Sequence, residues 1–203
     1  MKTLALIASL FLLTACSAIK SPVTNRYKLT SYSSSRADHT SSSTLLITPT
    51  TALDGYETNQ MRYSAQPFTV SSYTKNNWIS PPANMLYALL IQSLQSSHYF
   101  SAVGSGAYFS KTTYRLDTQL LELQQNFIKK PSVLALKVKA VLTQVDNNQI
   151  IASKTFNQEI TCPQETPYGG VIAANQATLK LTKDVTHFVM SRVAKTTNSG
   201  KGL

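Results

Sequence analysis

The sequence predicts an α+β fold, a two-layer sandwich in which a mixed, mostly antiparallel sheet of five to seven strands carries two helices on one face. Two observations predict it. Three runs in the second half, residues 113–124, 133–145 and 149–161, alternate apolar and polar side chains, as half-buried strands do. Two further segments, residues 80–97 and 171–195, repeat apolar residues at helical spacing instead. A sheet and helices that each have one apolar face bury those faces against each other.

The N-terminus predicts a lipoprotein signal peptide over residues 1–15. Lys2 precedes an apolar run of about ten residues, which is too short to cross a bilayer as a helix. Residues 13–16 read Leu-Thr-Ala-Cys, the pattern of a bacterial lipobox in which cleavage precedes Cys16 and its sulfur carries the lipid. The alternative is an ordinary secretory signal with an accidental cysteine. With lipidation at Cys16, acyl chains such as palmitate hold the mature chain on a membrane surface.

Residues 16–44 are rich in Ser and Thr and predict a tether that lifts the domain off the membrane. Within it, residues 25–32 place Tyr27 and Leu29 in alternation with polar residues, which predicts a short strand. The main domain is expected over residues 45–196, and the polar, glycine-containing residues 197–203 are expected to fray.

The segment before the first helix predicts short strands and a candidate partner interface. Residues 45–48 form an apolar run that stops at Pro49, and residues 61–63 and 68–73 predict a hairpin. Five aromatic side chains lie between residues 56 and 78, and aromatic residues are enriched at interfaces. They are Tyr56, Tyr63, Phe68, Tyr73 and Trp78. Packing over the first helix is the alternative explanation.

The first helix is expected over residues 80–97, with Ser80 as its N-cap and Pro81 at its first helical position. Gly104 and Gly106 then predict a turn. In the strand that follows, the apolar phase slips by one residue after Leu120, which predicts a bulge. The three long strands form an antiparallel meander with one solvated face.

The composition limits the classes of partner. The formal net charge is +10, and the basic residues are scattered rather than grouped in an arm. An exported lipoprotein rarely meets nucleic acid, so the charge favours a solvated basic face or attraction to anionic headgroups.

Catalytic and metal chemistry find little support in the sequence. With Cys16 lipidated, Cys162 is the only thiol left, and a partly buried free thiol explains it best. His39, His98 and His187 show no metal-binding spacing, and the carboxylates form no recognisable pair. We therefore expect a protein that is not an enzyme and that has no metal and no cofactor.

Several motifs in fixed order resemble the ABC-type transport auxiliary lipoproteins, which accompany Mce-type intermembrane lipid transport systems. The matching positions, after the lipobox, are Asn25, Tyr27, Leu29, residues 45–49, Gly55, Tyr56, residues 59–63, Tyr73, Asn77, Trp78, Pro81, Pro82, Met85, Leu86, Leu94, Phe100, Val103, Ala173, Asn175 and Ala177. The resemblance implies a noncatalytic subunit with a fold similar to the N-terminal domain of TolB. It also implies partners, namely an ABC permease, an ATPase and an Mce-domain protein.

The resemblance and the lipobox together give an expected location. Ser17 follows the lipidated cysteine in place of the aspartate that retains lipoproteins at the inner membrane, so we expect the periplasmic, inner leaflet of the outer membrane. There the protein would dock the assembly for phospholipid or another hydrophobic cargo, with homo-oligomerisation left open. The alternative is a structural or assembly lipoprotein, a pilot or scaffold without a transport role.

Overall fold

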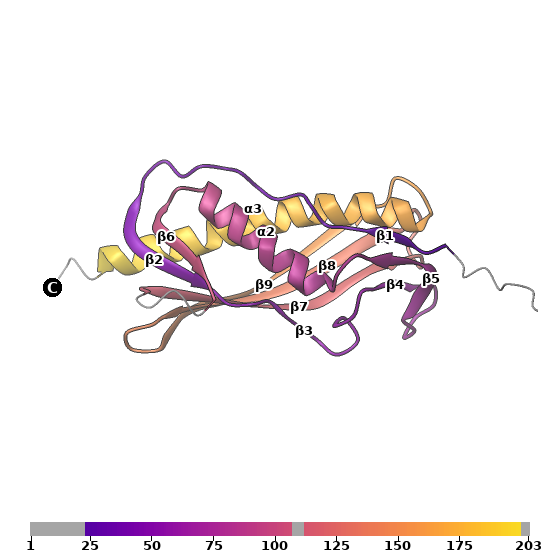
Figure 1. Cartoon of the computed structure of the whole chain (residues 1–203), viewed down its shortest axis with the longest axis horizontal. Coiled ribbons are helices and arrows are strands. Elements are labelled where there is room, and N and C mark those ends of the chain that lie inside the picture. Colours follow the sequence, from indigo (N-terminus) through magenta and orange to yellow (C-terminus); the bar gives the residue numbers. More distant parts are fainter. Residues whose placement is uncertain (1–22, 107–111, 200–203) are drawn as a thin grey trace, which may run out of the picture.

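A computed structural model describes residues 23–106 and 112–199 as one sheet covered on a single face by two helices (Figure 1). The expected signal peptide, Cys16 and residues 200–203 of the expected tail lie outside the described residues. The two-layer α+β prediction is confirmed. Over the described ranges the sheet has nine strands rather than five to seven.

The antiparallel meander forms the larger part of the sheet. It consists of β7 (Tyr114–Asn126), β8 (Val133–Gln144) and β9 (Gln149–Thr161), paired in that order. Alternation turns Leu116, Leu120 and Val138 toward the helices, where all three are fully buried. The register shifts between Leu120 and Glu122, so the predicted bulge is confirmed. The opposite face is polar and carries ion pairs such as Lys137 with Glu122.

The second edge of β7 is shared by three short strands along its length, and all three run parallel to it. They are β2 (Ser41–Ile47), β3 (Thr51–Ala52) and β4 (Gln60–Ser64). Parallel pairings are therefore more frequent than the sequence predicts. The reason is that alternation indicates which face of a strand is buried but carries no information on strand direction.

The predicted hairpin is present as β4 and β5 (Ser71–Trp78), which pair antiparallel. The first strand, β1 (Asn25–Tyr27), pairs parallel with β5, with Asn25 opposite Asn76 and Tyr27 opposite Trp78. The chain upstream of Asn25 therefore heads toward the tip of the hairpin. This places the N-terminal exit and the hairpin at one end of the molecule (Figure 1).

The two helices are α2 (Pro82–Ser96) and α3 (Pro167–Ser199). Their predicted apolar stripes form the core together with the sheet. The fully buried members include Leu86, Leu90, Leu94, Leu181, Val185 and Val189. The expected N-cap at Ser80 is wrong, because Pro81 occupies the cap position and no side chain caps the helix. Pro82 is the first helical residue, where its missing N–H leaves no bond unmade.

The expected turn at residues 104–106 is also wrong over most of its length. Residues Phe100–Ser105 form strand β6, which pairs parallel with β2, with Gly104 opposite Leu46. Pairing with a neighbouring strand outweighs the local preference of glycine for turns. Within residues 104–106, only Gly106 has a positive φ, of 76°.

Residues 28–40, expected in the tether, lie across the helical layer between β1 and β2 (Figure 1). Leu29 and Ser33 are buried, and the Ser33 N–H donates to Thr182 Oγ1 in α3 at 2.9 Å. The packed part of the chain thus begins well before residue 45. At the other end α3 continues to Ser199, beyond the expected helix end at residue 195.

Candidate functional site

The five predicted aromatic residues lie in four different environments. Trp78 is only 3% exposed and belongs to the hydrophobic core. Its position supports the alternative explanation for this residue, packing over the first helix. The remaining four residues lie nearer the surface, on both faces of the sheet and at the tip of a hairpin.

Tyr56 lies on the outer, polar face of the sheet. Its hydroxyl donates to Gln124 Oε1 at 2.9 Å, and the nearby Glu122 belongs to the ion pairs of that face. Partial burial of the phenol, followed by the Glu122 carboxylate, raises the pKa of Tyr56 to about 12. The hydroxyl therefore remains a hydrogen-bond donor throughout the physiological pH range.

Tyr63 and Tyr73 form a stacked pair on the opposite, helix-covered side. Their ring centroids are 4.6 Å apart, and the Tyr73 hydroxyl donates to Gln125 Oε1 at 3.0 Å. Burial also raises the pKa of Tyr73, with Tyr63 the next contributor. Tyr63 is opposite Gln125 in the pairing of β4 with β7, whereas Tyr56 binds Gln124. Because neighbouring residues of a strand point to opposite faces, Tyr56 and Tyr63 do not share a surface.

Gln125 lies between the Tyr73 side of the sheet and the start of α3. It is 2% exposed, and its Nε2 donates to Ser132 Oγ at 3.0 Å. Gly170 gives it room, since a Cβ on Gly170 would stand 2.5 Å from Gln125 Oε1. Cys162 belongs to the same buried polar group, and burial raises the pKa of its thiol, so this thiol is protonated and unreactive.

Phe68 differs from the other four because it is fully exposed. It lies at the tip of the β4–β5 hairpin with a φ of 64°, a left-handed conformation that a bulky residue adopts at a cost. Val70, two residues further on, is 54% exposed. Neither the fold nor the core gains from an aromatic side chain at this tip.

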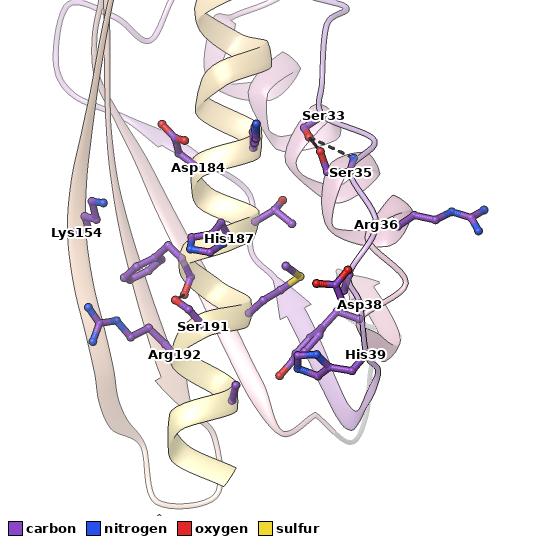
Figure 2. Close-up of a pocket in the computed structure, with 17 residues that line it drawn as sticks. Ser33, Ser35, Arg36, Asp38, His39, Lys154, Asp184, His187, Ser191 and Arg192 are labelled. Atoms are coloured by element: carbon purple, nitrogen blue, oxygen red, sulfur yellow. Dashed lines mark hydrogen bonds between the residues drawn. The ribbon is translucent and has the colours of Figure 1, made fainter. Parts of the chain in front are cut away.

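A groove of about 810 Å³ runs along α3 (Figure 2). Residues 33–39 form one wall, and Lys154 of β9 lies on the other side. Lys154 stands over the Phe156 ring at 4.9 Å, and Arg192 stands over the Phe188 ring at 5.8 Å. These two cations are held by aromatic rings and not by carboxylates, because the three ion pairs of the described residues involve other cations.

The same groove brings His187 near Asp184, which is the arrangement that an enzymatic role would need. Within the described residues, however, no hydrogen bond joins His187 to a carboxylate or a hydroxyl, and Asp184 Oδ2 accepts from Gln158 Nε2 at 2.8 Å. His39 contacts the Tyr99 ring edge-on at 5.6 Å. A nucleophile, a base and a group that orients the base are therefore not assembled here.

Across residues 23–106 and 112–199, no three His, Cys, Asp or Glu side chains gather closely enough to hold a metal ion. Neither α2 nor α3 has the length and apolarity of a membrane-crossing segment.

Asn175 has a structural role that the sequence alone did not assign to it. Its Oδ1 accepts from the Thr30 N–H at 2.8 Å, and its Nδ2 donates to the Lys28 carbonyl at 3.2 Å and to the Val171 carbonyl at 3.1 Å. An asparagine inside a helix, among small apolar residues, was the available signal, because such a side chain competes with the helix for backbone partners. Two of its partners, Thr30 and Lys28, lie about 145 residues away and were not visible in the pattern.

Comparisons with known proteins identify a matching family and solved structures of similar fold. A family model described as ABC-type transport auxiliary lipoprotein component matches residues 27–186. A sequence comparison with curated proteins finds no match.

Solved structures support the fold. Protein XCC0632 from Xanthomonas campestris is similar with a TM-score of 0.78 and 15% identity, over 86% of this chain and 99% of that one. The hypothetical protein CT253 from Chlamydia trachomatis is similar with a TM-score of 0.54 and 8% identity, over 75% of this chain and 98% of that one. At such identities the likeness concerns the fold alone.

Proposed function

The chain belongs to the family of ABC-type transport auxiliary lipoprotein components, and on that premise we propose that it is the noncatalytic subunit that docks an Mce-associated transport assembly at the outer membrane. Family membership makes it an auxiliary lipoprotein of an ABC transport system, held at a membrane of the cell envelope. The observation that carries the proposal is the extent of the match, which covers residues 27–186 and so includes strands β2 to β9, all of α2 and the first half of α3.

The anchor supports the outer membrane as the location. Cys16 ends the lipobox, and Ser17 follows it where an inner-membrane lipoprotein usually has aspartate. In this proposal the lipid fixes one end of the chain, the folded domain binds the Mce-domain protein, and phospholipid or another hydrophobic cargo passes through the assembly. The domain contributes binding and position and no chemical step.

The contact with the assembly is proposed for one of two aromatic surfaces. Tyr63 and Tyr73 form one of them, together with the Phe127 ring, which lies 6.0 Å from Tyr63. Tyr56 marks the other, on the outer face. Tyrosines of this kind combine a large apolar area with a polar tip and are frequent energetic centres of interfaces.

The experiment is affinity purification of the lipidated full chain from its native membranes, with the co-purifying permease, ATPase and Mce-domain protein quantified. We expect all three with the wild-type chain and none after Cys16→Ala, which removes the lipid. Purification of the membrane-anchored chain without any of them would overturn the transport role and favour an assembly scaffold.

A second step locates the contact. Tyr56→Ala and Tyr63→Ala are compared separately, each with its thermal unfolding measured to show that it folds. Because the two side chains lie on opposite faces, loss of the assembly in one variant only identifies the face that binds. Retention in both variants would contradict an aromatic interface at either site.

A further inference from the structure

Two loop tips lie side by side at one end of the molecule and carry exposed apolar side chains. The first is the β4–β5 tip at residues 66–70, and the second is the β7–β8 loop at residues 127–130. The Phe127 N–H donates to the Ser64 carbonyl at 2.8 Å, which fixes the two tips together. Fully exposed Phe68 lies on the first tip and Ile128, 47% exposed, on the second.

The lysines beside these side chains add positive charge. Lys129 and Lys130 follow Ile128 directly, and both are exposed. Lys129 binds Glu159 at 2.6 Å, but about half of its side chain remains accessible to solvent. Apolar side chains flanked by lysines are the composition of protein surfaces that rest in the interfacial layer of an anionic membrane.

The parallel pairing of β1 with β5 places the start of the described chain, and so the attachment of the proposed lipid anchor, at the hairpin end of the molecule. Because β1 is parallel to β5, the chain upstream of Asn25 continues toward Ser71 and the hairpin tip. Cys16 precedes Val23, the first described residue, by seven positions, which span at most about 25 Å. An acylated Cys16 therefore keeps Val23, at the hairpin end of the domain, within about 25 Å of the bilayer.

The conformation of Phe68 indicates that folding is not the reason for its presence. A φ of 64° suits glycine or asparagine, and a phenyl ring without contacts contributes no packing there. An aromatic residue in a strained, solvent-exposed turn is explained if its ring is buried in an apolar environment outside the protein.

We propose that the two tips contact the lipid bilayer, with Phe68, Val70 and Ile128 in the interfacial layer and Lys129 and Lys130 against anionic headgroups. The inference rests on the proposed lipid anchor at Cys16. It gives the tethered domain a fixed orientation: the hairpin end touches the membrane, and the turn between β8 and β9, at the far end, points away from it.

The test uses the lipidated full chain, reconstituted into vesicles of phosphatidylethanolamine and phosphatidylglycerol. F68C carries a polarity-sensitive fluorophore, and I150C is the matched control, since Ile150 is 63% exposed at the opposite end. Cys162 is buried and Cys16 is acylated, so the introduced thiol reacts selectively. We expect a blue-shifted emission at position 68, quenched by nitroxide-bearing lipids, and a water-like emission at position 150.

The charge is tested in the same vesicles. K129Q/K130Q should weaken insertion of the labelled tip by about fivefold per lysine, and K139Q/K180Q, which alters two exposed lysines elsewhere, should leave it unchanged. Equal effects of the two double variants would contradict a specific role for the tip lysines.

A water-like label at position 68 in an anchored chain would overturn the inference and leave the lipid anchor intact. Shielding of that label only when the transport assembly is added would also overturn it and would assign the tip to a protein partner. Failure of the proposed anchor gives a different result, because the wild-type chain would then leave the membrane fraction altogether.

Discussion

The Asn175 side chain in α3 binds the backbone of Thr30, accepting the Thr30 N–H at 2.8 Å, and so fastens the N-terminal segment to the helical layer. Asn175→Ala removes this bond and the bond to the Lys28 carbonyl, and we expect the free energy of unfolding to fall by about 2 kcal/mol. Denaturant titration measures the change. Gln176→Ala is the control, because Gln176 is exposed on the same helix. Equal losses in the two variants would contradict the fastening role.

Gly170→Ala should destabilise the protein through Gln125. A Cβ on residue 170 would lie 2.5 Å from Gln125 Oε1, so the glutamine has to move away from the Tyr73 hydroxyl. We expect a loss of about 2 kcal/mol, of the kind that overpacking and a broken buried hydrogen bond produce. In a Gln125→Ala background the same substitution should cost at least about 1 kcal/mol less. Additive losses in this double-mutant cycle would show that the two residues are uncoupled.

Alkaline pH should weaken the fold through Tyr56. Its pKa is about 12 in the folded state against 10.0 for an ordinary tyrosine, so between those values the unfolded chain binds fewer protons than the folded one. The stabilisation is complete below pH 10 and is lost as the pH rises toward 12. Spectrophotometric titration of wild type and Tyr56→Phe gives the titration of this one phenol by difference. A difference curve centred near pH 10 would contradict the shift.

His98→Gly should stabilise the protein. His98 follows the end of α2 with a φ of 52°, a left-handed conformation that glycine adopts without steric cost, and its side chain is exposed. We expect a gain of about 1 kcal/mol, seen as a higher melting temperature. Gln92→Gly, in the exposed middle of the same helix, should lower the stability by about as much. Opposite signs at the two positions are the expected result.

The sequence predicted the elements whose pattern is long and regular. The meander from Tyr114 to Thr161, its bulge after Leu120 and the stripe of α2 follow from spacing alone, because burial of one face imposes a period. Strand direction was not predictable in this way, and the parallel pairings of β2, β3 and β4 with β7 depend on contacts distant in sequence. Gly104 shows the same limit, since its partner Leu46 decides its conformation.

The candidate interface shows where composition stops being informative. Five aromatic residues within 23 positions predict a shared surface, yet Trp78 is in the core and the bonds of Tyr56 and Tyr73 lead to opposite faces of β7. In the meander the alternation of side chains over many residues fixes which face is buried. The short strands between residues 51 and 78 are too brief, and too often interrupted, for the sequence to show which of their side chains face the core.

The pairing of β1 with β5 also decides how the domain responds to mechanical load. Tension on the chain upstream of Val23 pulls β1 along its own axis, and the ladder hydrogen bonds between β1 and β5 lie across that direction. They are therefore loaded together, in shear, and do not open one after another as in a zipper. The domain is in this way protected where β1 joins the sheet, although the strand that bears the force is only three residues long.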